Sequence, residues 1–351
     1  MAHSHTLHEA QPYDARHPAH VRAWLYAVAA LVFLMLSVGG ATRLTGSGLS
    51  ITQWQPIVGT LPPLSQADWL EAFARYRQIP QYEHVNRGMS LEAFKIIFWW
   101  EWTHRFLGRL VGAAFLLPFL CFLAAGRMPR ALAASLAGIF ALGALQGAVG
   151  WYMVRSGLAA RIDVSQYRLA LHLGLAILIF GALIWVALSL DEPRIRAGAG
   201  WSPRAVAAGL VVLLVFLQIE LGALVAGLKA GAGYNTWPLM DGRLVPAGLG
   251  AMQPWYLNLF ENALTVQFNH RAVAYALVLA TAWHAWNVRS RAAMLLAGGV
   301  FAQAALGVWT LLAQVPLALG LAHQAGAAAV FGIAVWHLHG LRHVAAPAIP
   351  A

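Results

Sequence analysis

The chain has 351 residues, of which 60% are hydrophobic and only 10% are charged. This composition excludes an ordinary soluble domain and predicts an all-α integral membrane protein surrounded by membrane lipid. The formal net charge of +10 could indicate nucleic-acid binding, but the basic residues are scattered through short segments between apolar stretches and form no basic arm. No nucleic-acid partner is therefore expected.

Eight apolar stretches are long enough to cross a bilayer, because a spanning helix needs about 20 mostly apolar residues. They predict two four-helix bundles, over 23–190 and 205–340, joined by a cytoplasmic linker at 191–204. Residues 1–22 are expected to be a disordered tail whose histidines form no metal site, and 341–351 a second tail. The predicted spans are 23–42, 96–125, 131–153, 169–190, 205–228, 263–287, 292–313 and 318–340.

The basic residues predict the orientation of the chain. The short segments GRMPR, DEPRIR and RSR carry arginine at a higher density than the segments on the other side of the membrane. Short loops rich in Lys and Arg stay in the cytoplasm, so both termini are expected there. The longest outer segments, 43–95 and 229–262, contain Trp, Tyr and Pro and are expected to form compact caps.

Three sequence patterns occur twice and in the same order. EWTHRFLGRLVG matches VQFNHRAVAYAL, LQGAVGWYMV matches AQAALGVWTLL, and ALHLGLA matches LAHQAGAA. The repeat predicts two pseudo-symmetric bundles with the same orientation, because four crossings return the chain to the side where it began. Small residues are expected to let the helices approach closely: Gly108, Gly112, Gly143, Gly147, Gly222 and Gly227.

Each predicted bundle has two histidines near the outer ends of its spans, His104 with His172 and His270 with His323. They lie about four to nine residues inside, which at about 1.5 Å per residue is roughly 6 to 14 Å deep. Histidine in a membrane is costly unless it is paired or functional. Two imidazoles from facing helices suit the two axial faces of an iron porphyrin, whereas zinc usually needs three or four ligands at one point. We therefore expect two haem sites, with structural histidines as the alternative. The lone Cys121 excludes a CxxCH haem attachment.

Charged residues accompany these histidines. Arg105 and Arg271 are candidates to bind haem propionates. An equal alternative for Arg105 is an ion pair with Glu101, four residues earlier. Glu101 shares a helix face with His104, whereas the matching position in the second half is Gln267. This asymmetry predicts that one porphyrin reacts, with Glu101 handling protons, while the other relays electrons.

Four further polar residues in the spans have no equivalent in the repeat. One acid lies in the fifth span, and three histidines lie at or near the inner ends of their helices. They are expected to have structural or interfacial roles: Glu220, His284, His337 and His339.

Several longer motifs resemble the haem A synthase family, in the form found in proteobacteria and mitochondria. They are GGATRLTGSGLS, MSLEAFKIIFWWEWTHRFLGR, QGAVGWYMVRSGL, GALVAGLKAGAGYNTWPLM, VQFNHRAVAY and the AHQ of the last span, and the resemblance covers nearly the whole chain after residue 22. It implies an oxidoreductase of the bacterial inner membrane that oxidises the C8 methyl group of haem O to a formyl group. The product would be the haem A that cytochrome oxidases require.

The resemblance also implies roles for single residues. His104 and His172 match the ligands of the substrate porphyrin, haem O or the product haem A. His270 and His323 match the ligands of haem B, and Glu101 matches the catalytic acid. Some members have a cysteine pair in the outer segment after the first span, and this sequence has none there. A mechanism that needs such a pair does not apply.

Two other functions remain as alternatives, and several partners are implied. A bis-histidine di-haem cytochrome b would also need two histidine pairs, but it usually places its haems at different depths. A transporter built from repeats would have polar groups in the membrane, but no reason for paired histidines. The resemblance implies haem O synthase, oxidase assembly proteins and an unidentified electron-transfer protein as partners. A homo-oligomer is left open.

Overall fold

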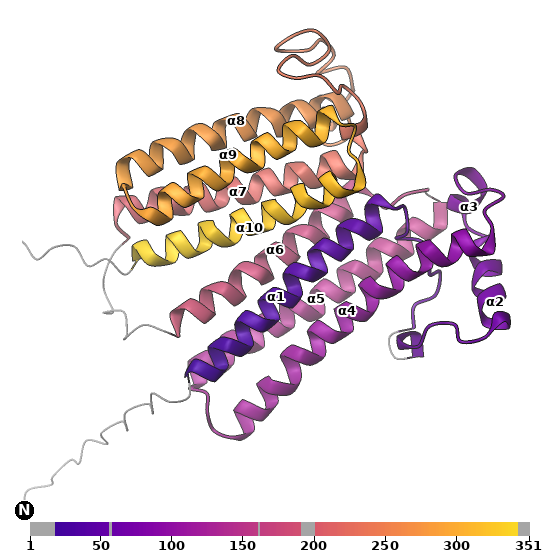
Figure 1. Cartoon of the computed structure of the whole chain (residues 1–351), viewed down its shortest axis with the longest axis horizontal. Helices are drawn as coiled ribbons and strands as arrows, with labels where there is room; N and C mark the ends of the chain where they lie inside the picture. The colour runs from indigo at the N-terminus through magenta and orange to yellow at the C-terminus, as the bar shows by residue number, and fades with distance from the viewer. Residues whose placement is uncertain (1–17, 56–57, 161, 191–200, 343–351) are drawn as a thin grey trace, which may run out of the picture.

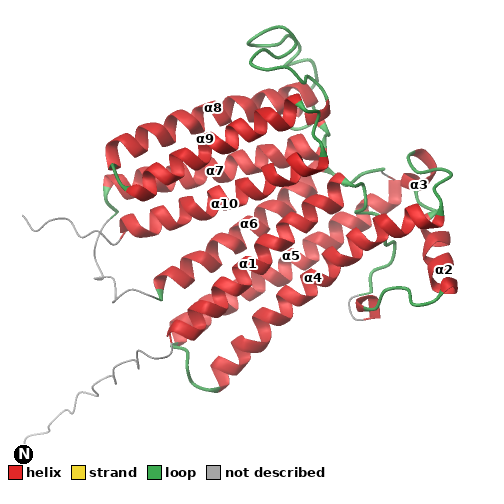
Figure 2. Cartoon of the chain, viewed as in Figure 1, coloured by secondary structure: helices red, strands yellow, loops and turns green. Residues whose placement is uncertain are grey.

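The computed structural model describes residues 18–55, 58–160, 162–190 and 201–342, and within these ranges helices are the regular secondary structure (Figures 1 and 2). Most of the predicted tails and linker fall outside these ranges. The first helix begins at Pro18, inside the segment expected to be a tail. The eight long helices are α1 (Pro18–Leu44), α4 (Leu91–Ala124), α5 (Arg130–Ala160), α6 (Gln166–Ser189), α7 (Pro203–Gly227), α8 (Ala263–Val288), α9 (Arg291–Leu312) and α10 (Leu317–Arg342).

Seven of these helices are long and apolar enough to cross a membrane, namely all but α8. The chain is therefore a multi-pass, all-α membrane protein. Helix α8 has 26 residues, as many as α10, but its first third is polar. Gln267 and Thr265 on this part of α8 are buried, so their side chains point into the protein.

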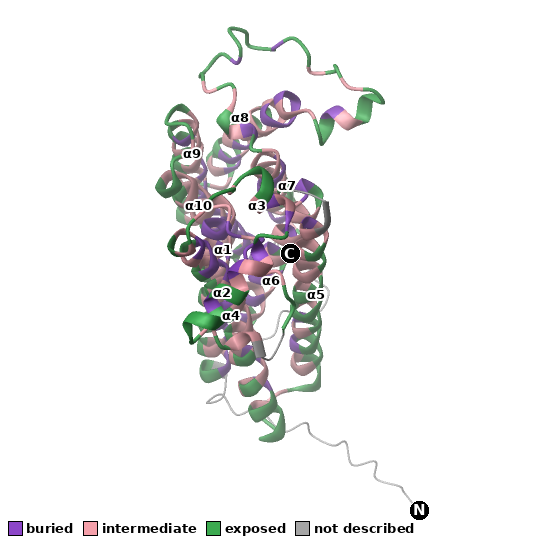
Figure 3. Cartoon of the chain, turned by 90° about the vertical axis from the view of Figure 1, so that its right-hand side faces the viewer, coloured by how far each residue is buried: buried purple, intermediate pink, exposed green. Residues whose placement is uncertain are grey.

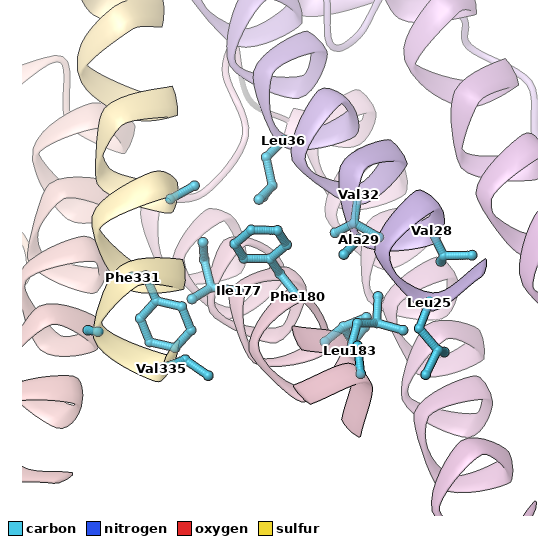
Figure 4. Close-up of a cluster of buried hydrophobic side chains, with 14 of the residues drawn as sticks. Leu25, Val28, Ala29, Val32, Leu36, Ile177, Phe180, Leu183, Phe331 and Val335 are labelled. Carbon is cyan, nitrogen blue, oxygen red and sulfur yellow. The ribbon is translucent and has the colours of Figure 1, made fainter. Parts of the chain in front are cut away.

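The helices form two groups that follow the order of the chain (Figure 1). In the first group α1 packs along α4 and α6, and in the second α7 packs along α8 and α10. The groups meet through α1, α6, α7 and α10. Apolar side chains fill this junction (Figure 4), among them Leu25, Val28, Ile177, Phe180 and Phe331.

The two outer segments differ in structure. The first contains α2 (Gln66–Tyr76) and α3 (Pro80–His84), and α2 starts in a capping box between Ser65 and Asp68. Its apolar face packs on α4, with Trp69 against Phe98 at 4.9 Å between ring centroids. The compact cap expected for 43–95 is present. The helical parts of segment 229–262 are two short 3₁₀ turns, Ala230–Ala232 and Trp255–Leu259. The middle of this segment extends away from the bundle (Figures 1 and 3). The prediction of a compact cap at 229–262 was therefore wrong.

Helix packing is closer in the second group than in the first. Helix α8 contacts α9 along much of its length, whereas α4 and α5 contact each other sparsely. A Cβ atom built on Gly112, Gly143 or Gly147 would meet no atom of the described chain within 4 Å. The prediction that helices approach closely at these three glycines was therefore wrong, because the glycines lie on α4 and α5, which diverge. Gly108, Gly222 and Gly227 do approach side chains of neighbouring helices.

Histidines tie the inner ends of the helices together. His284 of α8 and His337 of α10 are both buried, and their Nε2 atoms are 2.8 Å apart, so one imidazole donates to the other. His339 Nε2 lies 3.1 Å from Ser189 Oγ of α6, and its ring meets Trp185 edge-on. These contacts support the structural roles expected for the three histidines.

Removing one partner of the His284–His337 pair should destabilise the protein. The variant His337→Leu leaves a polar imidazole nitrogen buried, which costs about 1–2 kcal/mol. The double variant with His284→Leu removes both polar groups, so its loss should be smaller than the sum of the two single losses. Thermal unfolding in detergent measures these losses, and additive effects would contradict the coupling.

Candidate functional site

The four outer histidines come from α4, α6, α8 and α10, one per helix. The rings of His270 and His323 meet edge-on, with centroids 6.5 Å apart and planes at 81°. Metal–imidazole bonds of about 2 Å place two opposite ligand nitrogens about 4 Å apart, with the ring centroids farther out. The distance between the centroids is therefore compatible with a metal between the rings. His104 and His172 lie on α4 and α6, which both pack along α1.

Each imidazole lies against a glycine of a neighbouring helix. A Cβ atom built on these glycines would come within 2.8 to 3.2 Å of a ring atom. At Gly150 and Gly307 the distance is 2.8 Å, which real side chains essentially never show, so a larger residue there would push the ring out of place. At Gly39 and Gly222 the contact is tight, and the ring would have to shift by a few tenths of an ångström. The pairs are Gly39 of α1 with His104, Gly150 of α5 with His172, Gly222 of α7 with His270, and Gly307 of α9 with His323.

Glutamine amides hold three of the histidines. Gln146 Nε2 donates to the main-chain oxygen of His172 at 2.9 Å, and Gln303 does the same for His323 at 2.6 Å. The sequence repeat had already matched these two glutamines. Gln218 of α7, which the sequence analysis missed, donates to the oxygen of His270 at 3.0 Å and lies 3.0 Å from its Nδ1. Gln218 stands four residues before Gly222, the same spacing as from Gln303 to Gly307. This spacing is the sequence signal that could have identified Gln218.

Glu101 is 2% exposed, and its two carboxylate oxygens have different partners. Oε2 accepts from Ser50 Oγ at 2.8 Å and from the Ile51 amide at 2.7 Å. Oε1 accepts from Arg105 Nη2 at 2.6 Å, so the ion pair considered from the sequence is present. Arg105 also donates to the main-chain oxygens of Ile51 and Gln53. The acid and the arginine thus fasten the first outer segment to the helix that bears His104.

The second half has the same arrangement with an amide in place of the acid. Gln267 Nε2 donates to the oxygens of Ala230 at 2.7 Å and Gly233 at 2.8 Å. Arg271 donates to Gln267 Oε1 at 2.9 Å and to the oxygens of Tyr234 and Thr236. The outer segment offers carbonyls here, whereas near Glu101 it offers an amide N–H. Each side chain therefore matches the polarity of its own segment.

Some buried polar atoms of the described residues have no hydrogen-bond partner, and three of them belong to the histidines or to the glutamines that contact them. They are His172 Nδ1, Gln146 Oε1 and Gln218 Oε1. Buried donors and acceptors are normally satisfied, so these three atoms fit a site that a bound group completes. The other such atoms of the described residues are Trp102 Nε1, Glu220 Oε1 and Arg271 Nε.

Comparison with known proteins identifies the family of the chain. The family model of the COX15-CtaA cytochrome oxidase assembly proteins matches residues 22–335. The chain belongs to this family. It is 56% identical over 335 residues to the heme A synthase of Parvibaculum lavamentivorans, covering 93% of this chain and 96% of that protein. It is 55% identical to the heme A synthase of Azorhizobium caulinodans and 54% identical to that of Bradyrhizobium diazoefficiens, covering 93% of this chain in each case and 95% and 91% of those proteins.

Membership of this assembly family confirms the resemblance found in the sequence. The matched range contains all four outer histidines and Glu101. The roles of these residues and of Arg105 and Arg271 stay predictions. The pairing of His270 with His323 and the unsatisfied atoms around both pairs fit an iron porphyrin in each half.

Alanine at the ring-contacting glycines should remove haem from one half at a time. In Gly150→Ala and Gly307→Ala the new methyl group would lie 2.8 Å from Cε1 of His172 and His323 respectively. Each variant should lose most of the haem of its own half, as measured by the haem content of the purified protein. Gly147→Ala on α5 and Gly298→Ala on α9 are matched controls, because a Cβ atom there meets nothing within 4 Å. Unchanged haem in the first two variants would refute the contacts.

Proposed function

We propose that the chain is a haem A synthase, which oxidises the C8 methyl group of haem O to the formyl group of haem A. The observation that carries the proposal is the paired histidines in both halves, with an acid beside only one pair, in a chain 56% identical to a heme A synthase. Written as half-reactions, the oxidations of the methyl group to an alcohol and of the alcohol to a hydrated aldehyde each consume one water and release two electrons and two protons. The aldehyde then forms by loss of water.

The proposed membrane arrangement has eight spans in two pseudo-symmetric four-helix bundles. Helix α8 is the eighth span, because it packs between α7 and α9 and buries its polar residues inside the protein. The matching glycine–histidine contacts support the symmetry. The arginine-rich short segments support cytoplasmic termini in the bacterial inner membrane.

The two histidine pairs have different tasks in this proposal. His104 and His172 hold haem O, and His270 and His323 hold haem B. When bound, haem B supplies one-electron transfer between the substrate side and an external electron-transfer protein. Gln218 and Gln303 donate to the main-chain oxygens of His270 and His323, which fixes the backbone that carries the proposed haem B ligands. Haem O synthase and oxidase assembly proteins are the proposed neighbours in the pathway.

Glu101 is the proposed acid–base group. It stands three residues before His104, so its carboxylate is the acidic group nearest to that ligand along the helix. The bonds from Ser50, Ile51 and Arg105 hold the carboxylate in one position and shield it from lipid. A fixed buried carboxylate can accept a proton at Oε1 or Oε2 and can stabilise positive charge that develops on the substrate.

Replacing the acid should separate catalysis from haem binding. Glu101→Gln should keep the haem content of both halves but lower haem A production by about 100-fold or more, the usual contribution of a general acid or base. Ser50→Ala is the control, because it removes one bond to the carboxylate and keeps the acid. Its loss should be far smaller. Normal haem A production by Glu101→Gln would exclude the acid from the mechanism.

Pigment analysis tests the function as a whole. Protein purified from cells that make haem O should yield haem B together with haem O or haem A on extraction. Haem B alone would instead favour a di-haem cytochrome b. That alternative has little support. The four outer histidines share one side of the membrane, so electrons that pass between them would cross only a small part of it.

A further inference from the structure

A hollow of about 290 Å³ lies at the outer end of the N-terminal half. The outer segment 51–54 forms one wall, and α5 forms the other. Two arginines line it from different helices, Arg105 of α4 and Arg155 of α5, together with Trp54 and Trp151. The hollow is therefore both cationic and aromatic.

Both arginines are held by neighbouring groups. The Arg155 guanidinium lies over the Trp151 ring, 5.1 Å from its centroid, and Trp54 meets Trp151 edge-on at 6.3 Å. Arg105 has five N–H donors, of which Nε–H, one Nη1–H and both Nη2–H are used in the bonds to Glu101, Ile51 and Gln53. Among the described groups no hydrogen bond uses the second Nη1–H, so this N–H can donate to a ligand. Two guanidinium groups across one hollow suit carboxylates, since Arg155 can bind one in a bidentate manner and Arg105 can donate its remaining N–H.

Two residues that line the hollow come directly after positions of the first histidine site in the sequence. Arg105 directly follows His104, and Trp151 directly follows Gly150, the glycine that contacts the His172 ring. A porphyrin held by His104 and His172 would therefore have the hollow within reach of its propionates. We infer that this hollow binds the propionate carboxylates of the substrate porphyrin and that Arg155 is a specificity-determining residue. The inference rests on the proposed function.

The C-terminal half lacks the second arginine. Alignment of Gly150 with Gly307 places Leu312 at the position of Arg155 and Val308 at that of Trp151. Only the N-terminal half therefore has an arginine at this position to bind propionates. In the proposed function this is the half that takes up and releases its porphyrin. The sparse packing of α4 against α5 agrees with this, since a ligand can enter between two helices that hardly touch.

Porphyrin binding to the full-length protein in detergent tests the inference without turnover. The probes are zinc protoporphyrin IX, which has two free propionates, and its dimethyl ester, which has none. The wild type should bind the free acid more tightly than the ester. Arg155→Leu should weaken binding of the acid by about tenfold or more and leave binding of the ester nearly unchanged. With haem O as substrate, the same variant should raise KM more than it lowers kcat.

Two further variants complete the design. Arg155→Lys keeps the charge but loses bidentate geometry, so its affinity for the acid should fall between wild type and Arg155→Leu. Arg77→Leu is the matched control, because Arg77 is also exposed on the outer side and lies over a ring four residues earlier, 5.1 Å from the Phe73 centroid. Equal binding of acid and ester by the wild type, or an unchanged preference in Arg155→Leu, would overturn the subsite. Neither result affects the pigment test of the proposed function.

Discussion

The outer layer of this protein is organised by the need to place imidazoles inside a membrane and hold them still. Hydrocarbon offers no hydrogen-bond partner to a ring nitrogen. Around the imidazoles the chain places small residues that admit the ring, and amides that add a second hydrogen bond to the carbonyl of the histidine. Gly307 and Gln303, four residues apart on α9, contact the His323 ring and the His323 carbonyl respectively. One neighbouring helix thus shapes the site and orients the ligand.

The comparison between Glu101 and Gln267 shows how the two halves accommodate an acid and an amide at matching positions. Both residues stand three positions before a histidine, and both link the helix to an outer segment through an arginine four residues later. The carboxylate needs donors, and the segment near it supplies the Ile51 amide. The amide of Gln267 needs acceptors, and its segment supplies two carbonyls. Each side chain therefore matches the polarity of its own outer segment, so the asymmetry belongs to each half as a unit.

Much of this arrangement could be predicted from the sequence, because it depends on patterns along single helices. The long apolar stretches gave the helices, and the repeated His–Arg and Gln patterns indicated which residues correspond. The partner of each ring could not be predicted in the same way. Gly39 and Gly150 contact histidines on other helices, and one sequence does not reveal which helix faces meet. For the same reason the glycines at 112, 143 and 147 were expected to bring helices together although they lie where α4 and α5 diverge.

In the proposed function, the difference in packing between the halves separates two tasks. The haem B proposed for the C-terminal half would be held by helices that pack along their length, as α8 and α9 do. The haem O proposed for the N-terminal half would need a weaker helix contact to enter and leave, and α4 and α5 provide one. The outer segment near this gap is fastened by Arg105 and Glu101 and is covered by α2 and α3, so the polar end of the site stays ordered while the helices below it stay apart. Rigidity at the outer rim and loose packing in the bilayer are therefore compatible within one four-helix unit.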